Sequence, residues 1–108
     1  MHAITVQELK KILDDGQDVY LIDVREDDEV KAYPMKGQDF THIPLGQVPD
    51  KVEDIPQDKP VVVFCKGGAR SARAIDYLET HHGFTNLTNL IGGMTAWAKE
   101  IDHSILPA

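Results

Sequence analysis

Four consecutive apolar residues, Val61 to Phe64, follow Pro60 and constrain the fold more than any other stretch of the sequence. Valine is branched at Cβ and favours extended backbone, so the stretch predicts a β-strand. A strand that is apolar at every position, rather than at alternate positions, has both of its faces buried. Strands of this kind are typical of parallel sheets, which are covered by helices on each side.

The rest of the chain alternates between predicted helices and predicted strands. Thr5 and Glu8 form the pattern of a capping box, and the apolar spacing after them predicts a helix that ends near Gly16. Helical spacing returns over residues 69–82 and ends at Gly83. The other predicted elements are a strand at 19–23, a short acidic helix or turn at 25–33, a short extended piece within 42–49, a strand at 84–90 and a final helix at 94–101. This alternation predicts an α/β fold with a central, mostly parallel sheet and helices on both faces.

Length, charge and cysteine content narrow the class of protein. The chain has 108 residues, which fits a single domain over 1–108 with its core at about 5–102. Its formal net charge of −7 repels nucleic-acid phosphates and anionic lipids, so we expect no nucleic acid and no membrane as partners. The single cysteine cannot form an internal disulfide, and the first residues lack the apolar run of a signal peptide. We therefore expect a cytoplasmic protein.

The only cysteine, Cys65, comes directly after the predicted central strand, at the end where ligands bind in α/β folds. Gly67 and Gly68 allow a sharp turn into the next helix, because glycine tolerates positive φ. The backbone N–H groups of such a turn, backed by a helix N-terminus, can point at one anion. Lys66 and Arg70 add positive charge beside the thiol. A thiol in this setting ionises more readily than usual, which predicts nucleophilic, covalent chemistry on a small anionic electrophile.

Packing is the alternative role for Cys65, because free cysteine is among the most buried residue types and behaves as a small apolar side chain. The two glycines, the flanking cations and the following helix favour a functional role instead. The stretch lacks the G-x-x-x-x-G-K-[ST] and G-x-G-x-x-G spacings of nucleotide-binding loops. Asp27 and Asp28 lack companion ligands in the sequence, so we expect no metal and no cofactor.

Four segments together resemble the single-domain rhodanese (thiosulfate sulfurtransferase-like) family over nearly the whole chain. They are YLIDVRE at 20–26, HIPLG at 42–46, VVVFCKGGARSARAIDYL at 61–78 and NLIGGMTAW at 89–97, in the order and spacing of that family. The resemblance implies one rhodanese-like domain in which Cys65 takes a sulfane sulfur from a small anionic donor such as thiosulfate and becomes a persulfide. The sulfur then passes to a thiophilic acceptor, which is cyanide in the usual assay, a thiol or a sulfur-accepting protein.

The resemblance also implies roles for the residues around the cysteine. The family's active-site loop, whose backbone amides surround the sulfur and bind the substrate, corresponds to Lys66, Gly67, Gly68, Ala69, Arg70 and Ser71. Arg70 corresponds to the arginine that closes this loop by pairing with a carboxylate, and both Asp23 and Glu29 are candidate partners. Asp23 and Arg25 correspond to an Asp-x-Arg motif whose roles are divided between structure and the mouth of the site. We expect His42 to be hydrogen-bonded and structural, because a thiolate held by amides needs no base.

Two departures from the family pattern lie beside the region that shapes access to the site. The segment between Glu29 and His42 is several residues longer than in many relatives. Leu45 and Gly46 stand where the family usually has Gly-Ala. These departures bear on the choice of substrate rather than on the chemistry.

Two other functions are compatible with parts of the pattern. A rhodanese-like module can act as a non-enzymatic or partner-dependent sulfur carrier or regulator, although such modules usually lose the cysteine or alter the loop. Small dual-specificity phosphatases share the architecture, but their loop holds one residue more between cysteine and arginine than the four found here. A tetrahedral phosphate needs the wider ring, so the shorter loop favours a single sulfur atom.

Overall fold

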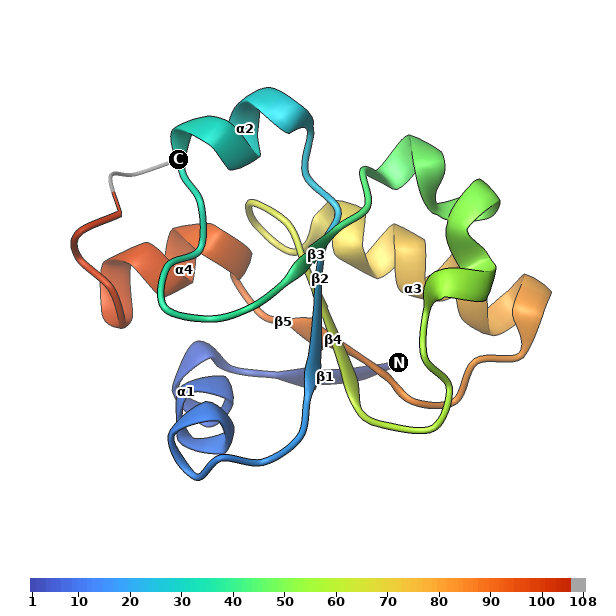
Figure 1. Ribbon diagram of the computed structural model, residues 1–108, viewed down its shortest axis with the longest axis horizontal. Coiled ribbons are helices and arrows are strands. Elements are labelled where there is room, and N and C mark those ends of the chain that lie inside the picture. The colour runs from blue at the N-terminus through green and yellow to red at the C-terminus, as the bar shows by residue number, and fades with distance from the viewer. Residues whose placement is uncertain (106–108) are drawn as a thin grey trace.

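The computed structural model describes residues 1–105 and has a five-stranded parallel sheet at its centre (Figure 1). The strands are β1 (His2–Ile4), β2 (Tyr20–Asp23), β3 (Thr41–His42), β4 (Val61–Phe64) and β5 (Leu87–Leu90). They lie in the order β1-β5-β4-β2-β3, so the fully apolar strand β4 occupies the middle of the sheet. Each pair of neighbouring strands is parallel, which confirms the predicted sheet.

Helices cover both faces of this sheet, as the α/β prediction requires. α1 (Val6–Asp14) and α4 (Gly93–Glu100) pack on one face, whereas α3 (Ala69–His82) and the 3-10 helix η1 (Leu45–Asp54) pack on the other. The short α2 (Asp27–Ala32) follows β2 and lies beyond the carboxyl end of that strand (Figure 1). Within residues 1–105, no helix combines the length and the apolar character needed to cross a bilayer.

The side chains of β4 alternate between two hydrophobic cores. Val61 and Val63 pack with α3 and η1, while Val62 and Phe64 pack with α1 and α4. All four residues are at most 3% exposed, which explains why the strand has no polar position. Burial of each such side chain contributes about 1.5–3 kcal/mol, so β4 is firmly held and fixes the position of the next residue, Cys65.

Two elements were not predicted from the sequence. β1 is an edge strand of three residues that pairs with β5, and its first two residues are exposed. It therefore lacks the apolar run that marks a buried strand. η1 begins three residues after β3, where the sequence predicted only a short extended piece. Pro49 lies within η1 and disfavours an α-helix, and the segment forms a 3-10 helix instead.

The carboxyl ends of β2, β3 and β4 meet at one edge of the sheet. Asp23, at the end of β2, is in register with Phe64 of β4 and with His42 of β3. Cys65 directly follows Phe64, and so the strand order brings Asp23, His42 and Cys65 to the same edge. Parallel strands thereby gather residues that are far apart in the sequence.

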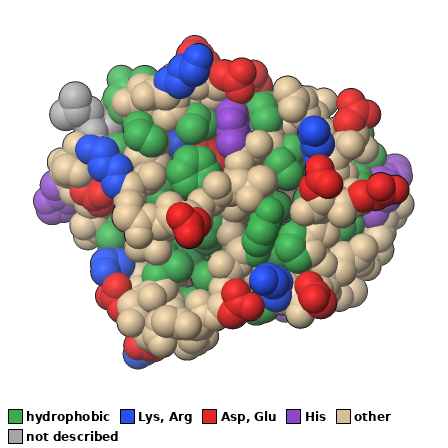
Figure 2. All heavy atoms as spheres, in the orientation of Figure 1, with side chains coloured by type: hydrophobic (Ala, Val, Ile, Leu, Met, Phe, Trp, Pro, Cys, Tyr) green, Lys and Arg blue, Asp and Glu red, His purple; other side chains and the backbone are tan. Residues whose placement is uncertain are grey.

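Charged side chains of both signs are interspersed over the face of the molecule shown in Figure 2. The whole sequence has a net charge of −7. On this face, however, the acidic side chains are mixed with lysine and arginine side chains rather than gathered in one patch. Exposed charges are screened by salt over about 10 Å at 0.1 M ionic strength. The electrostatics of the site are therefore set by its immediate neighbours more than by the net charge.

Candidate active site

Cys65 lies where β4 ends, and the chain turns sharply there into α3. The helix begins at Ala69, where the helical spacing of the sequence also begins. The N-cap residue of α3, Gly68, has a φ of +108°, which glycine adopts readily and other residues do not. The turn thus depends on glycine at this position and brings the N-terminus of α3 close to the cysteine.

The sulfur of Cys65 faces backbone N–H groups inside this turn. The N–H of Gly68 donates to Sγ over 3.1 Å, and the N–H of Ser71 donates over 3.4 Å. The hydroxyl oxygen of Ser71 lies 3.4 Å from the same sulfur. Cys65 is only 1% exposed, so these protein groups, rather than bulk water, form the surroundings of the sulfur.

Two opposing effects act on the ionisation of Cys65. Burial raises the pKa of the thiol, because a buried thiolate loses its hydration. Hydrogen bonds from the Ser71 hydroxyl and from the backbone N–H groups of Ser71, Gly68 and Gly67 lower the pKa. The hydrogen bonds outweigh burial, so the pKa of Cys65 lies below its ordinary value. The surroundings therefore favour the thiolate, which is the nucleophilic form of cysteine.

Of the two carboxylates considered for Arg70, the structure pairs it with Glu29. Nη1 and Nη2 of Arg70 donate to Oε1 and Oε2 of Glu29 over 2.6 and 2.8 Å. Such a bidentate pair is stronger and more directional than a single hydrogen bond. The pair ties the first turn of α3 to α2 and so closes the loop that begins at Cys65.

Asp23 pairs with Arg25 instead, inside the protein. Both side chains are 0% exposed, and Nη2 of Arg25 lies 2.8 Å from Oδ2 of Asp23. Oδ1 of Asp23 also accepts the backbone N–H of Arg25 over 3.0 Å. A buried ion pair requires this degree of hydrogen bonding to offset the lost hydration of both charges. The pair therefore fixes the chain between β2 and α2, and with it the position of Glu29.

His42 braces the same segment from β3. Its Nε2 lies 2.7 Å from the carbonyl oxygen of Arg25, and a carbonyl can only accept, so Nε2 carries the hydrogen. The other ring nitrogen, Nδ1, lies 3.7 Å from Oδ1 of Asp27. These contacts fit a structural role for His42.

Three residues of the predicted loop, Lys66, Gly67 and Ala69, are exposed. A Cβ on Gly67 would have no atom within 4 Å, so the outer side of the turn is open. Lys66 takes part in none of the ion pairs found within residues 1–105. The turn therefore presents backbone and one cation to an approaching ligand.

Two residues that the sequence analysis did not assign to the site complete it. Gly93, the first residue of α4, has a φ of +52°, and a Cβ there would stand 2.4 Å from the carbonyl oxygen of Cys65. Asn89 of β5 donates from Nδ2 to the carbonyl of Gly68 over 3.1 Å and accepts from the Ser71 hydroxyl over 2.6 Å. Two adjacent glycines at the start of α4 could have indicated a close approach of two backbone segments. A single asparagine in a strand carries no such pattern.

Comparison with known proteins shows which family the chain belongs to. The family model described as the rhodanese-like domain matches residues 5–100. The chain belongs to the rhodanese-like domain family. The resemblance that the four sequence segments indicated is thereby confirmed.

Relatives of this rhodanese-like domain are found both alone and within longer proteins. The putative sulfurtransferase YtwF of Bacillus subtilis is 41% identical, and the match covers 90% of each chain. The probable adenylyltransferase/sulfurtransferase MoeZ of Mycobacterium tuberculosis is 36% identical over 96% of this chain but only 26% of its own length. The crystal structure of a rhodanese-like domain protein from Staphylococcus aureus is 33% identical, with a TM-score of 0.82 over 94% of this chain and 95% of that one. Together these matches support a transferase of the rhodanese type.

The long segment between α2 and β3 packs beside α4. Met35 is 3% exposed and belongs to the same hydrophobic core as Trp97. The ring of Phe40 meets that of Phe64 edge to face, with ring centroids 6.2 Å apart. Figure 1 shows the segment running from α2 past α4 to β3. The apolar residues of this segment thus enlarge the core on the α4 side of the sheet.

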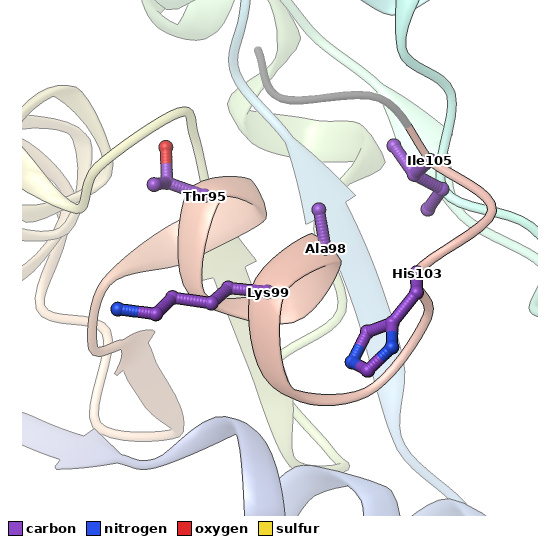
Figure 3. Close-up of a pocket in the computed structure, with 5 residues that line it drawn as sticks. All are labelled: Thr95, Ala98, Lys99, His103 and Ile105. Atoms are coloured by element: carbon purple, nitrogen blue, oxygen red, sulfur yellow. The ribbon is translucent and has the colours of Figure 1, made fainter.

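A hollow of about 370 Å³ lies along α4 (Figure 3). It is lined by Thr95, Ala98, Lys99, His103 and Ile105. Its Thr95 end adjoins the Cys65 turn, because the N–H of Thr95 donates to the carbonyl of Lys66 over 2.9 Å. The lining residues all lie on α4 or after it, and Cys65 is not among them.

The Glu29–Arg70 pair predicts how the stability of the domain depends on pH. Hydrogen bonds from Arg70 lower the pKa of Glu29 from 4.5 to about 2. A carboxylate with a lowered folded-state pKa stabilises the fold above its unfolded pKa, and this contribution is lost as the pH falls from about 4.5 to about 2. We expect Glu29→Gln to reduce the free energy of unfolding by about 1–2 kcal/mol at pH 7 and by little at about pH 2. Urea unfolding at both pH values measures the difference.

Asp28→Asn is the matched control for this variant. It removes a carboxylate from the same turn of α2, where Asp28 is exposed and forms none of the ion pairs found within residues 1–105. Loss of the Asp28 carboxylate should change the free energy of unfolding by less than about 0.5 kcal/mol. Equal effects of the two variants at pH 7, or a Glu29→Gln effect that persists at pH 2, would show that the pair does not stabilise the fold.

Proposed function

We propose that this rhodanese-like protein transfers sulfane sulfur from an anionic donor such as thiosulfate, carrying it as a persulfide on Cys65. The observation that carries the proposal is the position of Sγ, which lies at the end of the central strand and accepts the N–H groups of Gly68 and Ser71. The lowered pKa of the thiol supports a nucleophilic thiolate. With only one cysteine in the chain, loading cannot end in an internal disulfide.

The proposed reaction has two displacement steps at sulfur. In the first, the Cys65 thiolate attacks the outer sulfur of thiosulfate, a new S–S bond forms, and sulfite leaves with the electrons of the bond that breaks. In the second, an acceptor attacks the outer sulfur of the persulfide and the Cys65 thiolate is released. Cyanide gives thiocyanate in this step, and a thiolate gives a new persulfide. Each step starts from an anionic nucleophile, so the scheme needs no general base, in keeping with a structural His42.

We assign binding of the donor to residues 66–71, the turn and the first residues of α3. Thiosulfate is a dianion and the chain carries a net charge of −7, so binding depends on local positive groups. The N–H groups of the turn supply part of this potential, and Lys66 is an exposed cation next to the nucleophile. Arg70 is occupied by Glu29, and its contribution is to hold the turn closed.

A sulfur-accepting protein is the second type of acceptor that we propose. The outer side of the turn is exposed at Lys66, Gly67 and Ala69, which leaves room for a bulky partner to approach. The match to part of the longer adenylyltransferase/sulfurtransferase MoeZ also supports this proposal, because there a similar domain belongs to a chain named for a second transferase activity. Whether the acceptor is a small molecule or a protein, the proposed donor step and the Cys65 persulfide are the same.

Intact-mass spectrometry after incubation with thiosulfate and removal of the excess tests the proposal. We expect the mass to rise by one sulfur atom, to map to the peptide that contains Cys65, and to return to its original value when cyanide is added. Loading by a small-molecule persulfide but not by thiosulfate would refute thiosulfate as the donor. Failure of both donors to load the protein would overturn the persulfide mechanism.

A further inference from the structure

The hydroxyl group of Ser71 has two acceptors within reach of its hydrogen. The hydroxyl oxygen of Ser71 is 2.6 Å from Oδ1 of Asn89 and 3.4 Å from Sγ of Cys65. A hydroxyl has a single hydrogen, so Ser71 can donate to only one of them at a time. When it donates to Asn89, its oxygen offers lone pairs to the sulfur, and this arrangement suits a neutral thiol that donates its own hydrogen to Ser71.

The carbonyl of Gly68 fixes which end of the Asn89 amide faces Ser71. This carbonyl can only accept, so the amide must direct Nδ2 towards it, over 3.1 Å, and Oδ1 towards Ser71. The Gly68 carbonyl also lies 3.1 Å from the Ser71 hydroxyl. However, it already accepts the N–H of Ala72 over 3.2 Å as well as the Asn89 amide. Both of its lone pairs are in use, which leaves Asn89 and the sulfur as the competing acceptors for the hydroxyl.

We infer that Asn89 is a positioning residue that competes with the sulfur of Cys65 for the hydroxyl hydrogen of Ser71. In the thiol form the hydrogen lies on the short contact to Asn89. When Cys65 ionises, the charged sulfur is the stronger acceptor, and the hydroxyl rotates to become a third donor beside the N–H groups of Gly68 and Ser71. Asn89 therefore opposes ionisation of Cys65, and the Ser71 hydroxyl favours it.

The same competition determines where the Ser71 hydroxyl donates when Cys65 carries a persulfide, an inference that rests on the proposed function. In a persulfide the negative charge moves from Sγ to the outer sulfur, which weakens Sγ as an acceptor. The Ser71 hydroxyl then returns to Asn89. The hydroxyl thus follows the charge of Sγ through the reaction cycle, with Asn89 as its resting partner.

The charged groups around Cys65 are separate from this competition. They are Lys66 in the turn, Arg70 on α3, Glu26 and Glu29 at the start of α2, and the buried Asp23–Arg25 pair at the end of β2. The side chain of Asn89 is neutral, and so is the hydroxyl of Ser71. Neutral substitutions at these two positions therefore change hydrogen bonding and leave every one of these charges in place.

A double-mutant cycle on the pKa of Cys65 tests the inference. The rate at which iodoacetamide alkylates the single cysteine, measured against pH, gives this pKa for the wild type, Ser71→Ala, Asn89→Leu and the double variant. We expect Ser71→Ala to raise the pKa by about 1 pH unit, because the thiolate loses one donor. We expect Asn89→Leu to lower it by less than that, because the hydroxyl loses its acceptor at 2.6 Å and only the Gly68 carbonyl, 3.1 Å away and released from the Asn89 amide, still competes with the sulfur. In the Ser71→Ala background, Asn89→Leu should leave the pKa unchanged.

The alternative is that Asn89 acts only by holding the Gly68 carbonyl in place. In that case Asn89→Leu would shift the pKa equally in both backgrounds, and this result would overturn the inference, as would a rise of the pKa in the wild-type background. Asn89→Ala gives the same comparison if the leucine variant does not fold. Alkylation involves no sulfur transfer, so a failure of the proposed function would leave the outcome of this experiment unaffected.

Discussion

Cys65→Ser is expected to abolish sulfur transfer, with turnover of thiosulfate and cyanide reduced at least about a thousandfold. Cys65 is the only cysteine in the 108 residues, so no second thiol can take over the sulfur. The serine hydroxyl remains protonated at neutral pH and is a weak nucleophile unless a base activates it. The fold should persist, because serine is similar in size and its oxygen can accept the same N–H groups of Gly68 and Ser71.

Three measurements separate loss of chemistry from loss of structure in this variant. Steady-state turnover reports the reaction, intact mass reports sulfur loading, and a thermal melt reports the fold. Asp28→Asn, which removes an exposed carboxylate of α2, should keep wild-type turnover and serves as the control. Transfer by Cys65→Ser above about one per cent of the wild-type rate would rule out Cys65 as the sulfur carrier, because the expected loss is at least tenfold larger.

The sequence alone was enough to predict the central strand and the location of the thiol. Val61 to Phe64 are apolar at each position because their side chains enter two different cores, and this requires a middle strand of a covered sheet. Cys65 must then emerge at the carboxyl edge of that sheet. The capping box at Thr5 and Glu8 and the end of α3 at Gly83 were also predicted, since both depend on residues close to one another in the chain.

The features that the sequence could not predict depend on contacts between distant elements. Asp23 and Glu29 were equal candidates for Arg70, because Asp23 ends β2, Glu29 follows that strand closely, and both carry a carboxylate. The structure distinguishes between them. Asp23 forms a buried ion pair with Arg25, and Glu29 is the carboxylate that pairs with Arg70 on α3. Asn89 reaches the Cys65 turn only through the pairing of β5 with β4. No local pattern of residues encodes such a pairing.

Gly93→Ala is expected to have the second-largest effect, because Gly93 is where α4 meets the Cys65 turn. A Cβ at this position would stand 2.4 Å from the carbonyl oxygen of Cys65 and 2.7 Å from that of Lys66. Those two carbonyls accept the N–H groups of Met94 and Thr95 over 2.9 Å each. Both clashing atoms belong to backbone, which cannot rotate away as a side chain can. The new methyl group must therefore push α4 and the turn apart and weaken both hydrogen bonds.

The expected loss of stability in Gly93→Ala has two causes, this displacement and backbone strain. Gly93 has a φ of +52°, and a non-glycine residue in the left-handed region costs about 1–2 kcal/mol before any clash is counted. With two hydrogen bonds weakened as well, we expect the free energy of unfolding to fall by about 3 kcal/mol. For a domain of this size that corresponds to a decrease of about 12 °C in Tm. Sulfur transfer should fall at least about tenfold at temperatures where the variant is still folded, because a displaced turn holds the N–H donors away from Sγ.

Gly37→Ala separates the clash from the strain. Gly37 also has a positive φ, +78°, but a Cβ there would have no atom within 4 Å, and the residue lies in the segment between α2 and β3 rather than in the site. Its replacement should cost only the backbone strain, about 1 kcal/mol, and should leave sulfur transfer and the pKa of Cys65 unchanged. Thermal melts, turnover and the alkylation pKa of Cys65 compare the two variants directly. If Gly93→Ala lowers Tm no more than Gly37→Ala and retains full turnover, then contact with α4 is not what holds the Cys65 turn in its reactive shape.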